Sequence, residues 1–288
     1  MAAKQTPAPV TDRANPKIQR WEDLGLTLIH HFLSESEEAT MVAAFHAADP
    51  RTGGKKRLSQ HFGYHFDYTT FGASDTHFTP LPAYIAALLP RLPIQTNLPD
   101  QFTVQYYPPG SGIPPHVDTH SMFDEELYSV SFGSSVPMVF KKCGSNDARK
   151  MRLPKRSLLS SETEITACQT HTPVPGANGS PMASPSTEST NQSSQDGAPE
   201  EDLSSWEVLL PSRSLLLMTG PSRYGYTHGI KSRRTDVIDG QTVQREGRYS
   251  ITMRTTRRGD KIGCNCSYPG VCDARVREEL ERDAARSQ

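Results

Sequence analysis

Residues 248–254 read RYSITMR, a stretch in which polar and apolar side chains alternate strictly. An extended strand turns successive side chains to opposite faces, so one face of this segment is polar and the other apolar. The polar face holds Arg248, Ser250, Thr252 and Arg254, and the apolar face holds Tyr249, Ile251 and Met253. The pattern predicts a half-buried strand that presents two arginines on one side.

Other stretches of the second half also alternate or run apolar between turn residues. They are QFTVQYY at 101–107, LYSVSFG at 127–133, PMVF at 137–140 and SLLLMTG at 214–220. In the first half, LGLTLIHHF at 24–32 predicts a strand, and the aromatic-rich HFGYHFDYTTF at 61–71 predicts a strand or hairpin. We expect one helix to begin at Ser34, where Ser34 and Glu37 form a capping box, and a short one from Pro82 through Leu89. Helices followed by many short strands predict an α+β fold with a β-barrel or two-sheet roll.

A polar tract interrupts this pattern. Residues 160–205 contain no Lys, Arg, Phe, Tyr or Trp, so we expect a disordered insertion over about 144–205. LPKRSLL at 153–159 is echoed by LPSRSLL at 210–216, and only the second copy continues into an apolar strand. We therefore expect a flexible lead at 1–20, one domain over 21–273 and a C-terminal helix or tail at 274–288.

Composition narrows the class of protein. No stretch approaches the roughly 18 apolar residues of a membrane span, and the N-terminus lacks the apolar core of a secretory signal. Five irregularly spaced cysteines argue against a disulfide framework, so we expect a cytosolic or nuclear protein. The polar tract holds seven of the 32 acids, which leaves 25 acidic against 31 basic residues elsewhere. That modest positive excess is compatible with a nucleic-acid partner.

A sparse set of side chains points to chemistry. His116 and Asp118 flank a single residue, and His228 follows far downstream. Two imidazoles and one carboxylate are the set that holds non-haem iron(II) and leaves other positions open. Arg248 and Arg254 suit a dicarboxylate co-substrate such as 2-oxoglutarate. Taken singly, the histidines also fit turns and the arginines also fit a charged edge strand.

Three cysteines lie close together near the C-terminus. Cys264, Cys266 and Cys272 with one histidine from elsewhere would make a closed tetrahedral zinc site of the structural type. The alternative is three ordinary reduced thiols, which is the state we expect for Cys143 and Cys168.

Three segments together resemble the AlkB family of iron(II)- and 2-oxoglutarate-dependent dioxygenases. They are QFTVQYYPPGSGIPPHVDTH, RSLLLMTGPSRYGYTHGI and RYSITMR, and the likeness runs from about Leu24 to Asp273 without the insertion. HVDTHS, MTGPSRYxxTHGI and CNCSYPxVCD favour the branch that hydroxylates a modified wobble uridine of tRNA. The resemblance implies a double-stranded β-helix (jelly-roll) core with N-terminal helices and a nucleotide-recognition lid.

The same resemblance assigns roles to individual residues. It makes His116, Asp118 and His228 the iron ligands, with 2-oxoglutarate and O2 as co-substrates. Tyr107 would bond 2-oxoglutarate, Arg248 would pair with its distal carboxylate and Arg254 would support its near end. Gln105 stands where the family usually has Asn, and its side chain is one methylene longer. His120 would be the fourth zinc ligand, and the lid residues would be Arg57, His61, Phe62 and Tyr64, although core packing is an equal alternative for Phe62 and Tyr64.

The resemblance also implies partners. Similar proteins carry an RNA-recognition module before this domain and a tRNA methyltransferase after it, and neither fits within 288 residues. We therefore expect tRNA targeting and the methylated substrate to come from elsewhere. Two other functions stay open: oxidative demethylation of alkylated DNA, RNA or protein, and a non-catalytic nucleic-acid-binding or scaffold role with a relict iron pocket.

Overall fold

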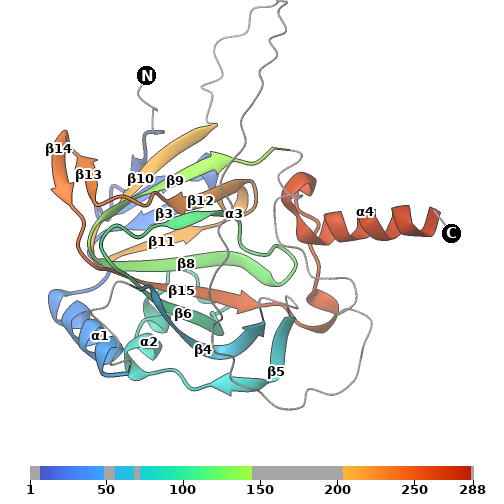
Figure 1. Cartoon of the computed structure of the whole chain (residues 1–288), viewed down its shortest axis with the longest axis horizontal. Coiled ribbons are helices and arrows are strands. Elements are labelled where there is room, and N and C mark those ends of the chain that lie inside the picture. The colour runs from blue at the N-terminus through green and yellow to red at the C-terminus, as the bar shows by residue number, and fades with distance from the viewer. Residues whose placement is uncertain (1–6, 49–55, 68–71, 145–203, 287–288) are drawn as a thin grey trace, which may run out of the picture.

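The computed structural model describes residues 7–48, 56–67, 72–144 and 204–286 (Figure 1). The expected insertion and the first copy of the repeated heptapeptide lie almost wholly outside these ranges, as does Cys168. The second copy of the repeat joins β10 (Ser205–Leu210) to β11 (Ser214–Met218), as predicted from its apolar continuation.

The described residues form two principal antiparallel sheets and one separate hairpin (Figure 1). The larger sheet runs in the order β1 (Val10–Thr11), β2 (Ile18–Trp21), β3 (Leu26–Ile29), β11, β8 (Phe123–Gly133), β15 (Arg248–Thr256), β6 (Gln101–Tyr107), β4 (Leu58–Asp67) and β5 (Gly72–Thr79). The smaller sheet runs β10, β9 (Val136–Lys142), β12 (Tyr226–Ile230) and β7 (Ile113–His116). The hairpin pairs β13 (Thr235–Ile238) with β14 (Gln241–Gln244).

Four α-helices accompany the sheets in the described part of the chain: α1 (Glu35–Ala48), α2 (Ala83–Ala86), α3 (Gly220–Tyr224) and α4 (Asp273–Arg286). The capping box at the start of α1 is confirmed, because the Glu37 N–H donates to Ser34 Oγ (3.2 Å) and the Ser34 N–H donates to Glu37 Oε2 (2.7 Å). None of the described helices is long and apolar enough to cross a membrane.

The larger sheet separates two apolar cores. On its outer face, side chains of β6, β8, β11 and β15 pack against Phe45 of α1 and Ile85 of α2. On its inner face, Leu216 and Met218 of β11 pack against the smaller sheet, where the Phe140 and Trp206 rings stack 4.3 Å apart. Two antiparallel sheets packed face to face over a shared core confirm the predicted double-stranded β-helix.

Strand β15 shows the predicted alternation. Tyr249, Ile251 and Met253 belong to the outer core, whereas Arg248, Ser250 and Arg254 turn inward and are buried. The inner face of the sheet is therefore apolar at β3 and β11 and polar at β6, β8 and β15. That change of character leaves room for a polar cavity between the sheets.

The described part of the N-terminal lead differs from the expected flexible segment. Ile18–Trp21 forms β2, which pairs antiparallel with β3 from Ile18 opposite Ile29 to Trp21 opposite Leu26. Trp21 is only 7% exposed, and its indole N–H donates to the Pro7 carbonyl at 2.7 Å. Burial of this ring in the inter-sheet core fixes a stretch that reads as polar and Pro-punctuated.

Candidate functional site

A cavity of about 400 Å³ lies between the polar part of the larger sheet and strands β7 and β12 of the smaller one. Polar side chains from β6, β8 and β15 form one wall, among them Thr103, Ser129 and Ser250. Met138 and Met218 contribute apolar surface. The cavity therefore joins the two sheets at the place where the inter-sheet core gives way to polar residues.

His116, Asp118 and His228 come together at this cavity. Their candidate ligand atoms all lie within 4.8 Å of one another. Strand pairing explains the meeting, because His228 of β12 is directly opposite His116 of β7, and Asp118 follows β7 by two residues. The His116 Nδ1 lies 2.9 Å from the Pro114 carbonyl, which fixes that ring through its second nitrogen. This donor set fits iron(II), with one side facing the open cavity.

Asp118 is held as a carboxylate by its surroundings. Arg254 donates to Asp118 Oδ1 at 2.7 Å and to Gln101 Oε1 at 3.0 Å. Burial opposes ionisation of Asp118, but Arg254 and the neighbouring histidines hold its pKa well below the usual range. Burial, reinforced by His116, lowers the pKa of His228 to about 3, so this imidazole is neutral and can act as a ligand.

Arg248 lies across the cavity from this cluster with spare hydrogen-bonding capacity. Its Nε donates to Ser131 Oγ at 3.0 Å, and its buried Nη1 has no partner among the described residues. Burial lowers the pKa of Arg248 to about 10, which leaves the guanidinium charged at neutral pH. A buried, charged fork that faces a cavity suits a carboxylate, so the residues present fit 2-oxoglutarate.

Tyr107 and Gln105 complete this wall. The guanidinium carbon of Arg248 lies 5.4 Å from the centre of the Tyr107 ring. The Tyr107 hydroxyl donates to Gln105 Oε1, and Gln105 Nε2 donates to Ser59 Oγ at 3.3 Å. Gln105 thus lines the cavity and orients Tyr107 even though it replaces the expected Asn. Arg254 also lines the cavity, where it donates to Asp118 and Gln101.

The structure brings two of the four expected lid residues to the cavity. Arg57 and His61 line it, and the Arg57 guanidinium lies 4.8 Å from the Tyr107 ring centre. Phe62 instead packs against the outer core, because β4 pairs it with the buried Phe102. Tyr64 lies away from the cavity, with Arg258 3.8 Å over its ring. Strand alternation, which puts 61 and 62 on opposite faces, is the reason for this division.

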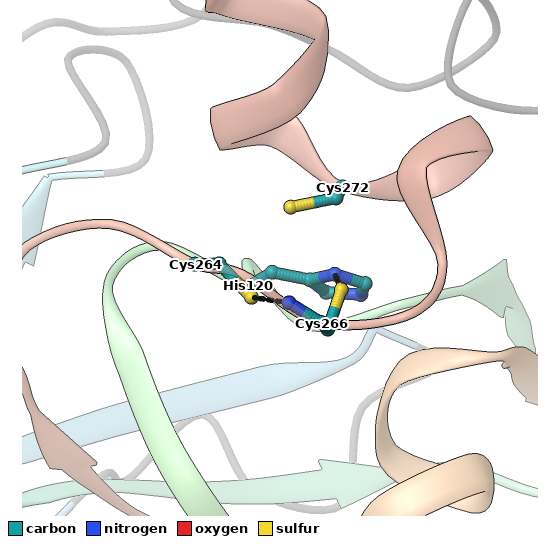
Figure 2. A group of neighbouring side chains, drawn as sticks. All are labelled: His120, Cys264, Cys266 and Cys272. Carbon is teal, nitrogen blue, oxygen red and sulfur yellow. Dashed lines mark hydrogen bonds between the residues drawn. The ribbon is translucent and has the colours of Figure 1, made fainter.

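The cysteine cluster is also assembled. Figure 2 shows His120, Cys264, Cys266 and Cys272 around one point, and their candidate ligand atoms lie within 4.8 Å of one another. His120 Nδ1 is 3.4 Å from Cys266 Sγ. Hydrogen bonds from Cys266 and Cys272 lower the pKa of the Cys264 thiol. Three thiols and one imidazole in a closed group fit structural zinc.

Three residues without a role in the sequence analysis hold the loop between the two clusters. Arg223 donates to the carbonyls of Asp118 and Thr119, Arg257 donates to the carbonyl of His120, and Asp273 accepts from the N–H of His120. Arg223 lies in the quoted MTGPSRYGYTHGI segment, and Asp273 follows a predicted zinc ligand. Neither position has a pattern that predicts contact with backbone carbonyls or N–H groups.

The chain matches one protein family and is similar to several known proteins. The 2OG-Fe(II) oxygenase superfamily matches residues 25–254. The tRNA (carboxymethyluridine(34)-5-O)-methyltransferase alkbh8 of Xenopus tropicalis is 31% identical over 276 residues, which cover 87% of this chain and 34% of that protein. The alkylated DNA repair protein ALKBH8 homolog of Arabidopsis thaliana is 27% identical over 260 residues, which cover 87% of this chain and 62% of that protein.

The chain spans about a third of the length of the Xenopus relative. Among solved structures, that of OsALKBH1 is similar, with 14% identity, a TM-score of 0.45 and coverage of 83% of this chain and 99% of that one.

Proposed function

Because the chain belongs to the 2OG-Fe(II) oxygenase superfamily, and within it to the AlkB family, we propose that it is a dioxygenase that hydroxylates a modified wobble uridine of tRNA. One observation supports the oxygenase activity in this proposal: a two-histidine, one-carboxylate cluster and a buried arginine with an unpaired Nη1 line the same cavity. Neither element alone requires oxygenase chemistry. Together they match a metal and a dicarboxylate bound side by side.

The residues around the cavity would bind the metal and the co-substrate. His116, Asp118 and His228 would hold iron(II), and Arg248 with Tyr107 would hold 2-oxoglutarate. Iron(II) with 2-oxoglutarate and O2 supplies the oxidant for hydroxylation of a C–H bond. Arg254 keeps Asp118 ionised and aimed at the cluster.

The proposed substrate rests on the relatives and on the cavity mouth. The Xenopus relative is named for a modified uridine at position 34 of tRNA. The cavity mouth carries Arg57 and His61, and burial together with nearby cations lowers the pKa of His61. A neutral imidazole beside a guanidinium can contact an unstacked base and its phosphate. Nucleic acid is therefore the substrate class that the site supports best.

We further propose a structural zinc ion at His120, Cys264, Cys266 and Cys272. The support is the closed group of four soft or borderline ligands within 4.8 Å. The tail that carries the cysteines would then be fixed to the loop after the iron ligand Asp118.

Two proposals concern the cellular setting. A tRNA methyltransferase activity would supply the modified uridine, since the Xenopus relative is named for that activity. A cytosolic or nuclear location would keep the thiols of the zinc group reduced.

Oxidative demethylation is the second candidate function. The Arabidopsis relative is named for repair of alkylated DNA, and the same cluster of ligands would serve that reaction. A non-catalytic role is disfavoured, because all three iron ligands and Arg248 are present and assembled.

Mass spectrometry of tRNA nucleosides tests these alternatives. Purified protein with iron(II), 2-oxoglutarate and tRNA from cells that lack wobble hydroxylation should add one oxygen to the wobble uridine. The Asp118→Ala protein should add no oxygen, because the metal loses one of its three ligands. Loss of a methyl group with release of formaldehyde would establish demethylation instead. Failure of the wild-type protein to form succinate with any nucleic acid would support a relict site.

A further inference from the structure

Arg223 is a charged side chain that is enclosed by the protein, and it makes no salt bridge within the described residues. It lies on α3 and is 1% exposed. We propose that Arg223 is a positioning residue that fixes the loop carrying Asp118 and so sets the affinity of the iron site. The inference rests on the proposed function, because it assumes that His116, Asp118 and His228 bind a metal.

The contacts of Arg223 are to backbone carbonyls of this one loop. Nη1 donates to the Asp118 carbonyl at 2.9 Å, and Nη2 donates to the carbonyls of Thr119 at 3.0 Å and Phe123 at 3.5 Å. The two nitrogens therefore span the first and the last residue of the 118–123 loop. A planar fork with fixed donor directions can do this, whereas a lysine ammonium acts as a single point.

The enclosure of this cation suggests a use beyond stability. Burying a charge is unfavourable unless hydrogen bonds compensate for lost hydration, and an apolar side chain of similar size often serves stability equally well. Burial lowers the pKa of Arg223, and the nearby Asp118 opposes that shift. The guanidinium nevertheless stays charged. The protein therefore keeps a full positive charge next to the backbone of the 118–123 loop.

Arg223 also ties the loop to the third iron ligand. Helix α3 leads through Gly225 into β12, which carries His228. Its beginning is anchored elsewhere, since Ser222 Oγ donates to the Gly25 carbonyl at 3.2 Å and the Gly220 N–H donates to Glu125 Oε1 at 2.5 Å. One short helix thus fixes the start of the His228 strand and, through Arg223, the main chain of Asp118.

The cysteine cluster includes a residue of the same loop, His120. The Tyr224 ring, next to Arg223, packs edge-on against His120 at 4.9 Å. Arg257 donates to the His120 carbonyl at 3.3 Å and to Asp124 at 2.7 Å. Arg223 is the one of these cations that contacts Asp118 itself, so its removal should affect iron more than zinc.

The test is a titration of the full chain with Mn²⁺, an oxygen-stable ion that the same imidazole and carboxylate ligands accept. Affinity would be measured by calorimetry for wild type, Arg223→Lys and Arg223→Met, alongside zinc content and melting temperature. Arg245→Lys is the matched control, because Arg245 is also a buried arginine, bonded to Asp236 and to the Lys231 carbonyl.

We expect Arg223→Lys and Arg223→Met to bind Mn²⁺ about tenfold or more weakly, as when other outer contacts of metal ligands are lost. Both should keep their zinc and a cooperative melting transition. Arg245→Lys should melt lower yet bind Mn²⁺ like wild type. For Arg223→Ala, added guanidinium at low millimolar concentration should restore affinity, whereas methylammonium should not.

The result that overturns the proposal is an Mn²⁺ affinity within about twofold of wild type in a folded Arg223→Lys or Arg223→Met protein. If Lys prevents folding, the Met variant decides, because it removes the charge and keeps most of the packing. Equal weakening in Arg245→Lys would also overturn it, since the effect would then follow stability alone. If wild type binds no Mn²⁺ at this site, the proposed function fails instead.

Discussion

The Asp273 carboxylate accepts a 2.9 Å hydrogen bond from the backbone N–H of His120, 153 positions earlier in the chain. It also accepts bonds from the N–H of Ser121 at 3.0 Å and from the Ser121 hydroxyl. Asp273 directly follows Cys272, and His120 lies two residues beyond Asp118. One carboxylate therefore joins the cysteine-rich tail to the loop that carries an iron ligand.

Asp273→Ala should destabilise the protein markedly. It would leave two backbone N–H groups and one hydroxyl without partners, and each buried unsatisfied group costs about 1–3 kcal/mol. We expect the free energy of unfolding in urea to fall by about 3 kcal/mol. Glu281→Ala, on an exposed part of α4, should change it by less than about 0.5 kcal/mol. Equal stability of the two variants would contradict this account of the tail.

Cys266→Ser should remove the zinc. Wild type should contain close to one zinc per chain, because thiolates favour zinc. Mild chelation should remove iron and leave this zinc in place, since the three iron ligands include no thiolate. The control is Cys143→Ser, whose thiol lies outside the group and should leave zinc unchanged. Elemental analysis measures both variants. Full activity and an unchanged melting temperature in zinc-free protein would refute the site.

Arg248→Lys should raise the KM for 2-oxoglutarate by roughly tenfold or more, since a hydrogen bond to a charged group contributes about 1.5–3 kcal/mol. Arg254→Lys should mainly weaken the metal site instead, because Arg254 bonds Asp118. Arg213→Lys, an ion-pair variant at Glu35 and Glu38, is the control with unchanged kinetics. Steady-state succinate formation separates the three. An unchanged KM for 2-oxoglutarate in Arg248→Lys would show that Arg248 does not bind this co-substrate.

His61→Ala and Phe62→Ala should have opposite consequences. His61 lines the cavity, so its loss should slow tRNA modification while leaving the melting temperature close to wild type. Phe62 packs on the outer core, so its loss should lower the free energy of unfolding by about 2 kcal/mol. Turnover with tRNA and thermal melts distinguish the two. If the Phe62→Ala protein were as stable as wild type but no longer modified tRNA, Phe62 would be a lid residue that contacts the substrate.

Most of the site could be predicted from sequence because its residues sit in patterned strands. The alternation in RYSITMR places Arg248 and Arg254 on the inner face, and the register of β15 with β6 sets Arg248 opposite Tyr107. His228 likewise meets His116 through strand pairing. Short-range periodicity therefore carried the prediction wherever a strand has one buried and one cavity-facing side.

The remaining parts depend on contacts that no local pattern encodes. Both faces of HFGYHF carry aromatic rings, so only pairing with β6 decides that Phe62 points outward and His61 inward. Trp21 is ordered by an inter-sheet core assembled from distant strands. Arg223 donates to main-chain carbonyls, which every residue possesses. The identity of the side chains around it therefore gives no sign of this role in the sequence.

Strand β15 also has a bearing on how this protein can change. Its odd-numbered residues Tyr249, Ile251 and Met253 fill the outer core, while its even-numbered arginines face the cavity. In a saturation library of this strand, odd positions should fail by reduced abundance in cells and even positions by lost turnover at normal abundance. Selection for thermostability would then change the odd-numbered positions, and selection for a new co-substrate would change the even-numbered ones. The two sets of codons alternate along the strand and do not overlap.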